Sequence, residues 1–232
     1  MVYKRKVVSI IPAKSWSREL PGKNVIPFCN KPLFCWTIEA SIKTHAIDKT
    51  ILMTDSNFYK DIVSNYRINI VKEPPLKNRE GEHVIYALLE VIKDYEHFNE
   101  DDVIVLLQPT SPLRNANHIS EALDLFLRGD DSNIISVTDS PKLESIRMLE
   151  DGCLSPITEG NPNIIRQSVS DKYLVNGAIY ISSVSKLREN RTFHTEDAVP
   201  YYMKPQYSID INNQNDLLLA KAIKRYLAES RR

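Results

Sequence analysis

Residues 7–24, VVSIIPAKSWSRELPGKN, decide the fold that we expect for the rest of the chain. The apolar, β-branched run 7–11 predicts a buried strand, and Pro12 ends it because proline cannot donate to a sheet ladder. A polar loop follows, and its cations are Lys14, Arg18 and Lys23. Three positive charges directly after a strand suit a polyphosphate, and open α/β sheets bind ligands beyond the carboxyl ends of their strands.

Two common phosphate-binding motifs are absent from this loop. It has no G-x-x-x-x-G-K-[ST] sequence, and Gly22 is its only glycine, which excludes a dinucleotide-binding fingerprint. The residues alone therefore leave two alternatives open: a polyphosphate site, or a solvated surface loop with ordinary lysines.

Beyond the loop, short apolar strands alternate with amphipathic helices. The predicted strands are 50–54, 68–71, 103–107, 134–137, 178–181 and 208–211. The predicted helices begin at Lys31-Pro32, cover 57–66, surround 85–92 and 119–126, and follow Asn213, with Asp216 in a capping arrangement. We expect the terminal helix to bury the stripe Leu219, Ile223 and Tyr226. This alternation predicts an α/β fold with a doubly wound, mostly parallel sheet.

Length and composition favour one domain, 1–232, with an appendage, rather than two full domains. Hydrophobic residues make up 42% of the chain, enough for a core. Two segments break the strand–helix rhythm, 140–172 and 185–205, and we interpret both as irregular excursions from the main sheet.

Charge and cysteine content narrow the class of partner and compartment. Lys+Arg and Asp+Glu both number 30, so we expect no bulk attraction to nucleic acid or to a membrane. No apolar run approaches the ~20 residues of a membrane span, and the N-terminus lacks a signal peptide's apolar core. Cys29, Cys35 and Cys153 are expected to be free thiols in a reducing cytoplasm. The five histidines show no zinc-like pairing with them.

A second motif, LQPTSPLR at 107–114, follows the most continuous apolar strand. Its two prolines hold the segment extended. We expect it to project four polar side chains toward the first loop: Gln108, Thr110, Ser111 and Arg114. The alternative is a plain turn before a helix.

Together the two motifs resemble the family of CMP-N-acylneuraminate synthetases and related CMP-nonulosonate synthetases, whose patterns are I-P-A-R-x-x-S-K-G-x-P-x-K-N and L-Q-P-T-S-P-L-R. Three further segments match in order: Thr54-Asp55-Ser56, Arg166-Gln167 ahead of NGAIY at 176–180, and SIDIN at 208–212, where the family has S-I-D-I-D. The likeness covers most of the chain. It implies a Rossmann-like nucleotidyltransferase fold.

The family reaction is attack of the anomeric hydroxyl of a 2-keto sugar acid on the α-phosphate of CTP, with release of pyrophosphate. The resemblance implies that CTP is bound by Pro12, Ala13, Lys14, Arg18, Lys23 and Asn24. It implies that the sugar acid meets Gln108, Arg166, Tyr180 and Phe193. It implies that Asp210 and Asn212 hold Mg²⁺, and that Asp210, Lys23 and Arg18 carry catalysis.

The chain departs from the family pattern at several positions. Lys14 stands where the family has arginine, which keeps the charge but loses the bidentate fork. Asn212 replaces the second aspartate of the D-x-D pair. A different acidic acceptor, or a nucleotide-binding homologue with little catalysis, therefore stays open.

The resemblance also implies a homodimer. We expect its contacts in 140–172 and 185–205. Phe193, Tyr201 and Tyr202 are either interface aromatics or core.

Overall fold

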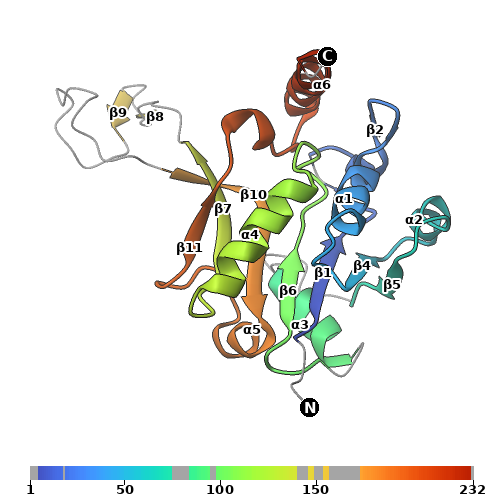
Figure 1. Cartoon of the computed structure of the whole chain (residues 1–232). Helices are drawn as coiled ribbons and strands as arrows, with labels where there is room; N and C mark the ends of the chain where they lie inside the picture. Colours follow the sequence, from blue (N-terminus) through green and yellow to red (C-terminus); the bar gives the residue numbers. More distant parts are fainter. Residues whose placement is uncertain are drawn as a thin grey trace.

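A computed structural model of the chain describes residues 5–17, 19–74, 84–94, 98–139, 146–148, 154–156 and 173–230. Within them, one sheet has the strand order β11-β7-β10-β6-β1-β4-β5 (Figure 1). Its strands are β1 (Val7–Pro12), β4 (Lys49–Thr54), β5 (Asn69–Lys72), β6 (Val103–Leu106), β7 (Ile134–Asp139), β10 (Tyr173–Ser183) and β11 (Val199–Tyr202). Two small antiparallel pairs are separate from it: β2 (Pro27–Phe28) with β3 (Lys31–Pro32), and β8 (Ile146–Met148) with β9 (Leu154–Pro156).

The sheet is parallel except at β10. That strand runs antiparallel to both of its neighbours, β6 and β7, whereas β1 pairs in parallel with β4 and β6, β4 with β5, and β7 with β11. This confirms the predicted mostly parallel sheet. It also places the carboxyl ends of β1, β4, β5 and β6 on the same edge.

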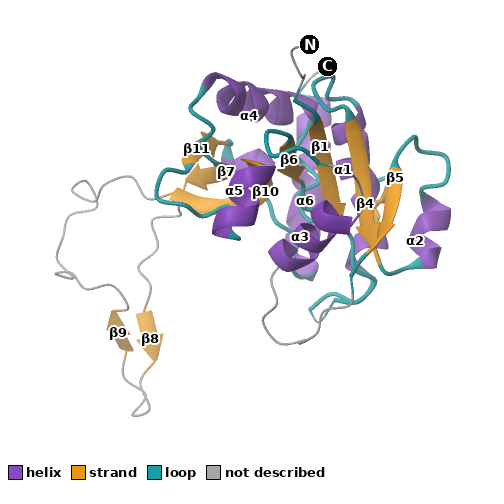
Figure 2. Ribbon diagram, turned by 90° about the horizontal axis from the view of Figure 1, so that it is seen from below, coloured by secondary structure: helices purple, strands orange, loops and turns teal. Residues whose placement is uncertain are grey.

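Helices cover both faces of this sheet, as the doubly wound interpretation requires. They are α1 (Leu33–Ile42), α2 (Asn57–Ile62), α3 (Val84–Asp94), α4 (Ala116–Arg128), α5 (Val184–Asn190) and α6 (Gln214–Glu229), with short 3₁₀ turns η1 (Lys23–Val25) and η3 (Pro205–Tyr207). Figure 2 shows α4 and α3 on opposite sides of the strands.

The alternation of side chains along β1 explains this two-sided packing. Val7 and Ile11 join the core that α1 and α4 cover, while Val8 and Ile10 join the core that α3 and α5 cover. Successive residues of a strand point to opposite faces, so a strand covered on both sides is largely apolar, and the buried Ser9 of β1 is hydrogen-bonded to the Ser41 hydroxyl at 2.6 Å. The unbroken run at the start of the chain is therefore the sequence of a fully buried strand.

A third, smaller core attaches α6 near the carboxyl edge of the sheet. Leu217 and Ala220 of α6 pack there with Phe28, Leu33, Leu113 and Ile211. The predicted cap is confirmed, since Asn213 and Asp216 form a reciprocal capping box. The predicted apolar stripe is wrong at two of its three positions. Leu219 and Tyr226 are exposed, because α6 is rotated to bury Leu217 and Ala220, whereas Ile223 is partly buried against this core.

Other boundaries differ from prediction. The first helix begins at Leu33, with Pro32 as its N-cap, and the helix predicted over 57–66 ends at Ile62. Segment 185–205 is not irregular, since it contains most of α5 and all of β11. Segment 208–211 is not a strand: its Ser208 N–H donates to the Pro205 carbonyl at 3.1 Å, closing η3, and its Ile211 N–H donates to the Thr110 carbonyl at 2.8 Å. Most of 140–172 lies outside the described residues.

No helix among the described residues is long and apolar enough to cross a membrane.

Candidate active site

Three segments that are distant in sequence meet near the carboxyl edge of the sheet. They are the loop after β1, the loop after β6, and the stretch between η3 and α6. The Ile211 N–H donates to the Thr110 carbonyl at 2.8 Å, and Lys23 Nζ donates to Asn212 Oδ1 at 3.2 Å. These two contacts join the last segment to both loops.

Asp210 lies at the end of a short polar relay. Asn212 accepts from Lys23 with its oxygen and donates through Nδ2 to Asp210 Oδ2 at 2.9 Å. The other oxygen, Asp210 Oδ1, is buried and has no hydrogen-bond partner among the described residues. A buried carboxylate oxygen without a donor is costly, so this atom is available for a cation or a proton.

The residues around Asp210 could supply one side of a magnesium site, but not a complete cage. In the described part of the chain, no three His, Cys, Asp or Glu side chains come together as a metal cluster. Mg²⁺ commonly takes only one or two protein carboxylates, with waters and substrate phosphates completing its shell. Asp210 Oδ1 fits that role, whereas Asn212 Oδ1 is occupied by the Lys23 ammonium.

Gly177 brings β10 against Gln108 and Asp210. Its φ of +73° lies in the left-handed region, and a Cβ there would come within 2.8 Å of Gln108 Oε1 and 3.9 Å of Asp210 Cγ. Any other residue would therefore strain the backbone and displace Gln108. The glycine of the NGAIY motif thus lets the predicted acid-binding glutamine lie beside the predicted metal-binding aspartate.

Tyr180 lies close enough to Asp210 to respond to its charge. Burial first, and then the Asp210 carboxylate, raise the pKa of the Tyr180 hydroxyl. The Tyr180 ring packs on Phe193 at 5.3 Å between centroids. Phe193 itself is buried in the core, as is Tyr201, whereas Tyr202 is exposed.

The predicted nucleotide-binding residues of the first loop are held by contacts with β4 and with each other. The Ala13 N–H donates to the Met53 carbonyl at 2.8 Å, which continues the β1–β4 ladder past Pro12. Asn24 is buried and donates through Nδ2 to the Lys14 carbonyl at 2.8 Å. Asn24 therefore fixes the path of the loop from its far end.

Lys14 is paired with an acid that we did not predict from the sequence. Its Nζ lies 3.1 Å from Oε1 of Glu73, the residue directly after β5. Burial raises the pKa of the Glu73 carboxyl, and the Lys14 ammonium partly opposes that rise. An acid two residues past the predicted strand 68–71 was the available signal, since such positions border the ligand edge of α/β sheets.

Two residues of the LQPTSPLR motif point inward instead of toward the first loop. Arg114 is buried and donates to the Ala178 and Gln108 carbonyls at 3.2 and 3.1 Å and to Thr37 Oγ1 at 2.8 Å. Burial lowers its pKa to about 9. Ser111 is also fully buried. The prediction that Arg114 projects into the crevice of the first loop is wrong: Arg114 ties the loop after β6 to β10 and α1.

Two predicted site residues, Arg18 and Arg166, lie outside the described residues.

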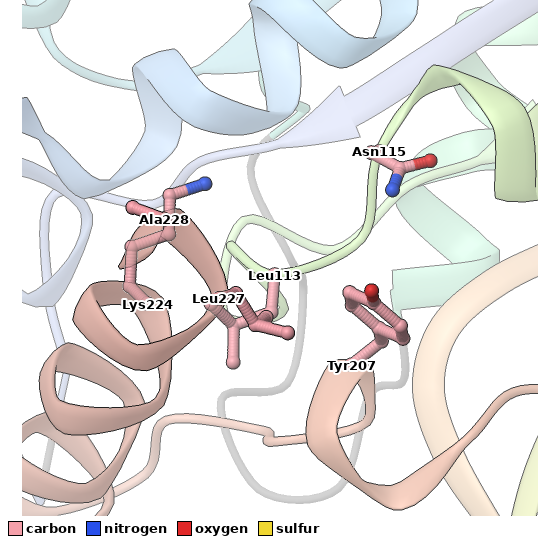
Figure 3. Close-up of a pocket in the computed structure, with 6 residues that line it drawn as sticks. All are labelled: Leu113, Asn115, Tyr207, Lys224, Leu227 and Ala228. Atoms are coloured by element: carbon pink, nitrogen blue, oxygen red, sulfur yellow. The ribbon is translucent and has the colours of Figure 1, made fainter. Parts of the chain in front are cut away.

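A hollow lined by Leu113, Asn115, Tyr207, Lys224, Leu227 and Ala228 lies between α6 and the loop after β6 (Figure 3). None of the residues assigned above to nucleotide, acid or metal lines it. The candidate active site is therefore the cluster around Asp210 and the first loop, not this hollow.

Comparison with known proteins identifies the family. The family model described as "Cytidylyltransferase" matches residues 8–146. An N-acylneuraminate cytidylyltransferase of Escherichia coli O18:K1:H7 is 34% identical over 95% of this chain, and one of Streptococcus agalactiae serotype V is 31% identical over 92%. This chain spans only about half of both relatives, 52% of their length.

A third relative has nearly the same length as this chain. The CMP-N,N'-diacetyllegionaminic acid synthase of Legionella pneumophila is 27% identical over 94% of this chain and 96% of its own.

Solved structures agree on the fold. CMP:2-keto-3-deoxy-manno-octonic acid synthetase complexed with CTP has a TM-score of 0.68 at 13% identity, covering 95% of this chain and 99% of its own. The 4-diphosphocytidyl-2C-methyl-D-erythritol synthase of Anaerococcus prevotii has a TM-score of 0.65 at 17% identity, covering 95% and 96%. The sequence match over more than half of the chain, with a sheet of the same architecture, leads to one conclusion: this chain belongs to the cytidylyltransferase family.

Proposed function

We propose that this chain transfers CMP from CTP to the anomeric hydroxyl of a 2-keto sugar acid of the N-acylneuraminate or nonulosonate class. The observation that carries the proposal is the relay from Lys23 through Asn212 to Asp210, which leaves one carboxylate oxygen free beside Gln108. The relatives named for N-acylneuraminate and for legionaminic acid support this class of acceptor.

The chemistry needs positioning and charge neutralisation more than covalent participation by the protein. The hydroxyl oxygen of the sugar acid forms a bond to the α-phosphorus, and the bond from that phosphorus to pyrophosphate breaks. The hydroxyl proton leaves to solvent, since Asp210 Oδ1 is the oxygen proposed to hold Mg²⁺. Lys23 and Arg18 neutralise the charge that develops on the departing pyrophosphate.

Mg²⁺ would supply charge neutralisation at the phosphates, with Asp210 as its protein ligand. Asn212 Oδ1 becomes free for the same ion when Lys23 turns from it toward the phosphates. Gln108, Tyr180 and Arg166 would hold the sugar acid, since a guanidinium binds a carboxylate with two parallel hydrogen bonds.

We further propose that the protein is a homodimer and acts in the cytoplasm, where Cys29 and Cys35 stay free thiols.

The test is release of pyrophosphate from CTP, Mg²⁺ and a panel of acids: N-acetylneuraminate, other nonulosonates and a phosphonate. We expect release only with a 2-keto sugar acid, and binding of CTP tighter than ATP because a pocket for a pyrimidine is too short for a purine. Calorimetry that shows equal binding of ATP and CTP would argue against the nucleotide assignment. Release with the phosphonate alone would indicate the other acceptor class, and tight CTP binding without release would indicate a non-catalytic homologue.

A further inference from the structure

A buried carboxylate lies at the edge of the sheet where the nucleotide is expected. The Glu73 N–H donates to the Thr54 carbonyl at 3.0 Å, and the Ala13 N–H donates to the Met53 carbonyl at 2.8 Å. β4 lies between β1 and β5, so Ala13 and Glu73 flank the end of the same strand. Glu73 is therefore a neighbour of the residues that the resemblance assigns to the base or ribose.

The Glu73 carboxylate is deeper than its cationic partner. The Glu73 side chain is 5% exposed, whereas that of Lys14, 3.1 Å away, is 41% exposed. Apart from the Lys14 ammonium, no described group donates to either carboxylate oxygen. Because buried polar atoms in native proteins are nearly always hydrogen-bonded, these oxygens are acceptors that a ligand can satisfy.

Stability alone is a poor explanation for this pair. Burying the Glu73 carboxylate costs desolvation, and attraction to the partly exposed Lys14 ammonium often fails to offset such a cost. The loop already has another anchor, since the Ser15 N–H and hydroxyl both donate to Asp55, at 2.7 and 2.8 Å. Retaining a second, buried acid next to Lys14 therefore fits a role in binding.

We propose that Glu73 and Lys14 together read the base edge of the nucleotide, with Glu73 accepting from the exocyclic amine of cytosine. This rests on the proposed function. Cytosine presents its N4 amine as a donor next to the acceptor N3, and a carboxylate is a standard partner for that amine. The pair on the protein presents an acceptor next to a donor, so the two edges are complementary.

The same arrangement rejects uracil. Uracil carries an oxygen acceptor, O4, in place of the amine, which would leave two acceptors facing each other next to Glu73. The depth of Glu73 suits a base, which is uncharged, while the triphosphate stays with Lys23 on the relay side. Lys14 then contributes its charge to the base edge rather than to the phosphates, because its ammonium lies 3.1 Å from Glu73 Oε1.

The experiment compares binding of CTP, UTP and 2′-deoxy-CTP by calorimetry for wild type and Glu73→Gln. Wild type should prefer CTP to UTP by about tenfold or more, the value of one hydrogen bond to a charged group. In Glu73→Gln, the amide can rotate to donate to uracil O4, so the preference should fall to about one. Asp55→Asn is the matched control, because Asp55 is a nearby carboxylate already bonded to Ser15, and it should keep the wild-type CTP:UTP ratio.

A second variant tests the same inference if Glu73→Gln does not fold. Glu73→Asp keeps the carboxylate but retracts it, so CTP binding should weaken while UTP stays rejected. Thermal unfolding of each variant checks that binding changes are not losses of fold.

Three results would overturn the inference. Glu73→Gln could keep the wild-type CTP:UTP ratio. It could bind both nucleotides more tightly, which would make Glu73 only a repelling charge. It could lose the preference for CTP over 2′-deoxy-CTP instead, which would make the ribose its partner. Wild type that fails to bind CTP at all would reject the proposed function first, so the two failures are distinguishable.

Discussion

At the scale of single residues, Asp210 is the group on which the proposed chemistry most depends. It holds one oxygen against Asn212 and leaves the other buried and free. We predict that Asp210→Asn abolishes pyrophosphate release, because Mg²⁺ loses its only predicted carboxylate ligand and a neutral amide cannot hold the ion equally well. A fully active Asp210→Asn protein would move the metal or the base to another residue.

Asn212→Asp is the companion variant. A second carboxylate should lower the Mg²⁺ concentration at half-maximal rate, while Lys23 keeps a partner 3.2 Å away in the arrangement of wild type. Pyrophosphate release titrated with Mg²⁺ separates two cases. A modest change in maximal rate indicates a working enzyme with one carboxylate, whereas an inert wild type that gains activity indicates a lapsed one.

At the scale of elements, the rotation of α6 decides which of its apolar residues matter. Lys224 of α6 lies 3.9 Å from the Trp36 ring centroid and Lys31 lies 4.1 Å from it, so this ring is covered by cations from two segments. Together with Leu217 in the small third core, this contact attaches α6 beside the loop that carries Asp210.

We predict that Leu217→Ala lowers the free energy of unfolding by about 2–4 kcal/mol, the usual cost of a cavity at a buried leucine. Leu217 is 3% exposed, whereas Leu219, two residues on, is 50% exposed. Leu219→Ala is therefore the matched control and should change stability by less than about 0.5 kcal/mol. Urea titration followed by circular dichroism measures both, and equal effects would mean that α6 packs in another rotation.

At the scale of the whole molecule, the first part of β10 presents an apolar surface to solvent. Tyr173, Leu174 and Val175 are about half exposed, and Tyr202 of the neighbouring region packs its ring 6.2 Å from that of Tyr173. Tyr173 and Val175 lie on one face of β10 and Leu174 on the other, and exposed apolar side chains gathered in one segment mark protein–protein contact sites. This surface is the best-supported place for the proposed dimer contact.

We predict a solution mass of twice 26.6 kDa by light scattering. Leu174→Glu should shift the mass toward the monomer, since a charge at an apolar contact is desolvated without a partner. Lys221→Glu, which alters an α6 position away from β10, is the charge control and should leave the mass unchanged. A monomeric wild type would contradict the dimer proposal.

The sequence by itself determined the sheet, its parallel character and the family. The evidence for these is local, since unbroken apolar runs mark strands covered on both faces and each motif is contiguous. The same reasoning wrongly predicted a strand at 208–211 and an irregular segment at 185–205. The apolar runs in these segments are too short to distinguish a strand from a helix or a turn. Periodicity also misplaced the buried face of α6, because its rotation is set by Phe28, Leu33 and Leu113.

Only the tertiary structure decided which polar side chains of the candidate site pair with each other. Lys23 donates a hydrogen bond to Asn212, 189 residues away in sequence. Lys14 forms an ion pair with Glu73, which follows β5. Arg114 is buried and donates to three acceptors. A sequence motif states which polar groups are present near a strand end. Which of them pair with each other, and which atom is left free for a ligand, depends on distances between segments that only packing fixes.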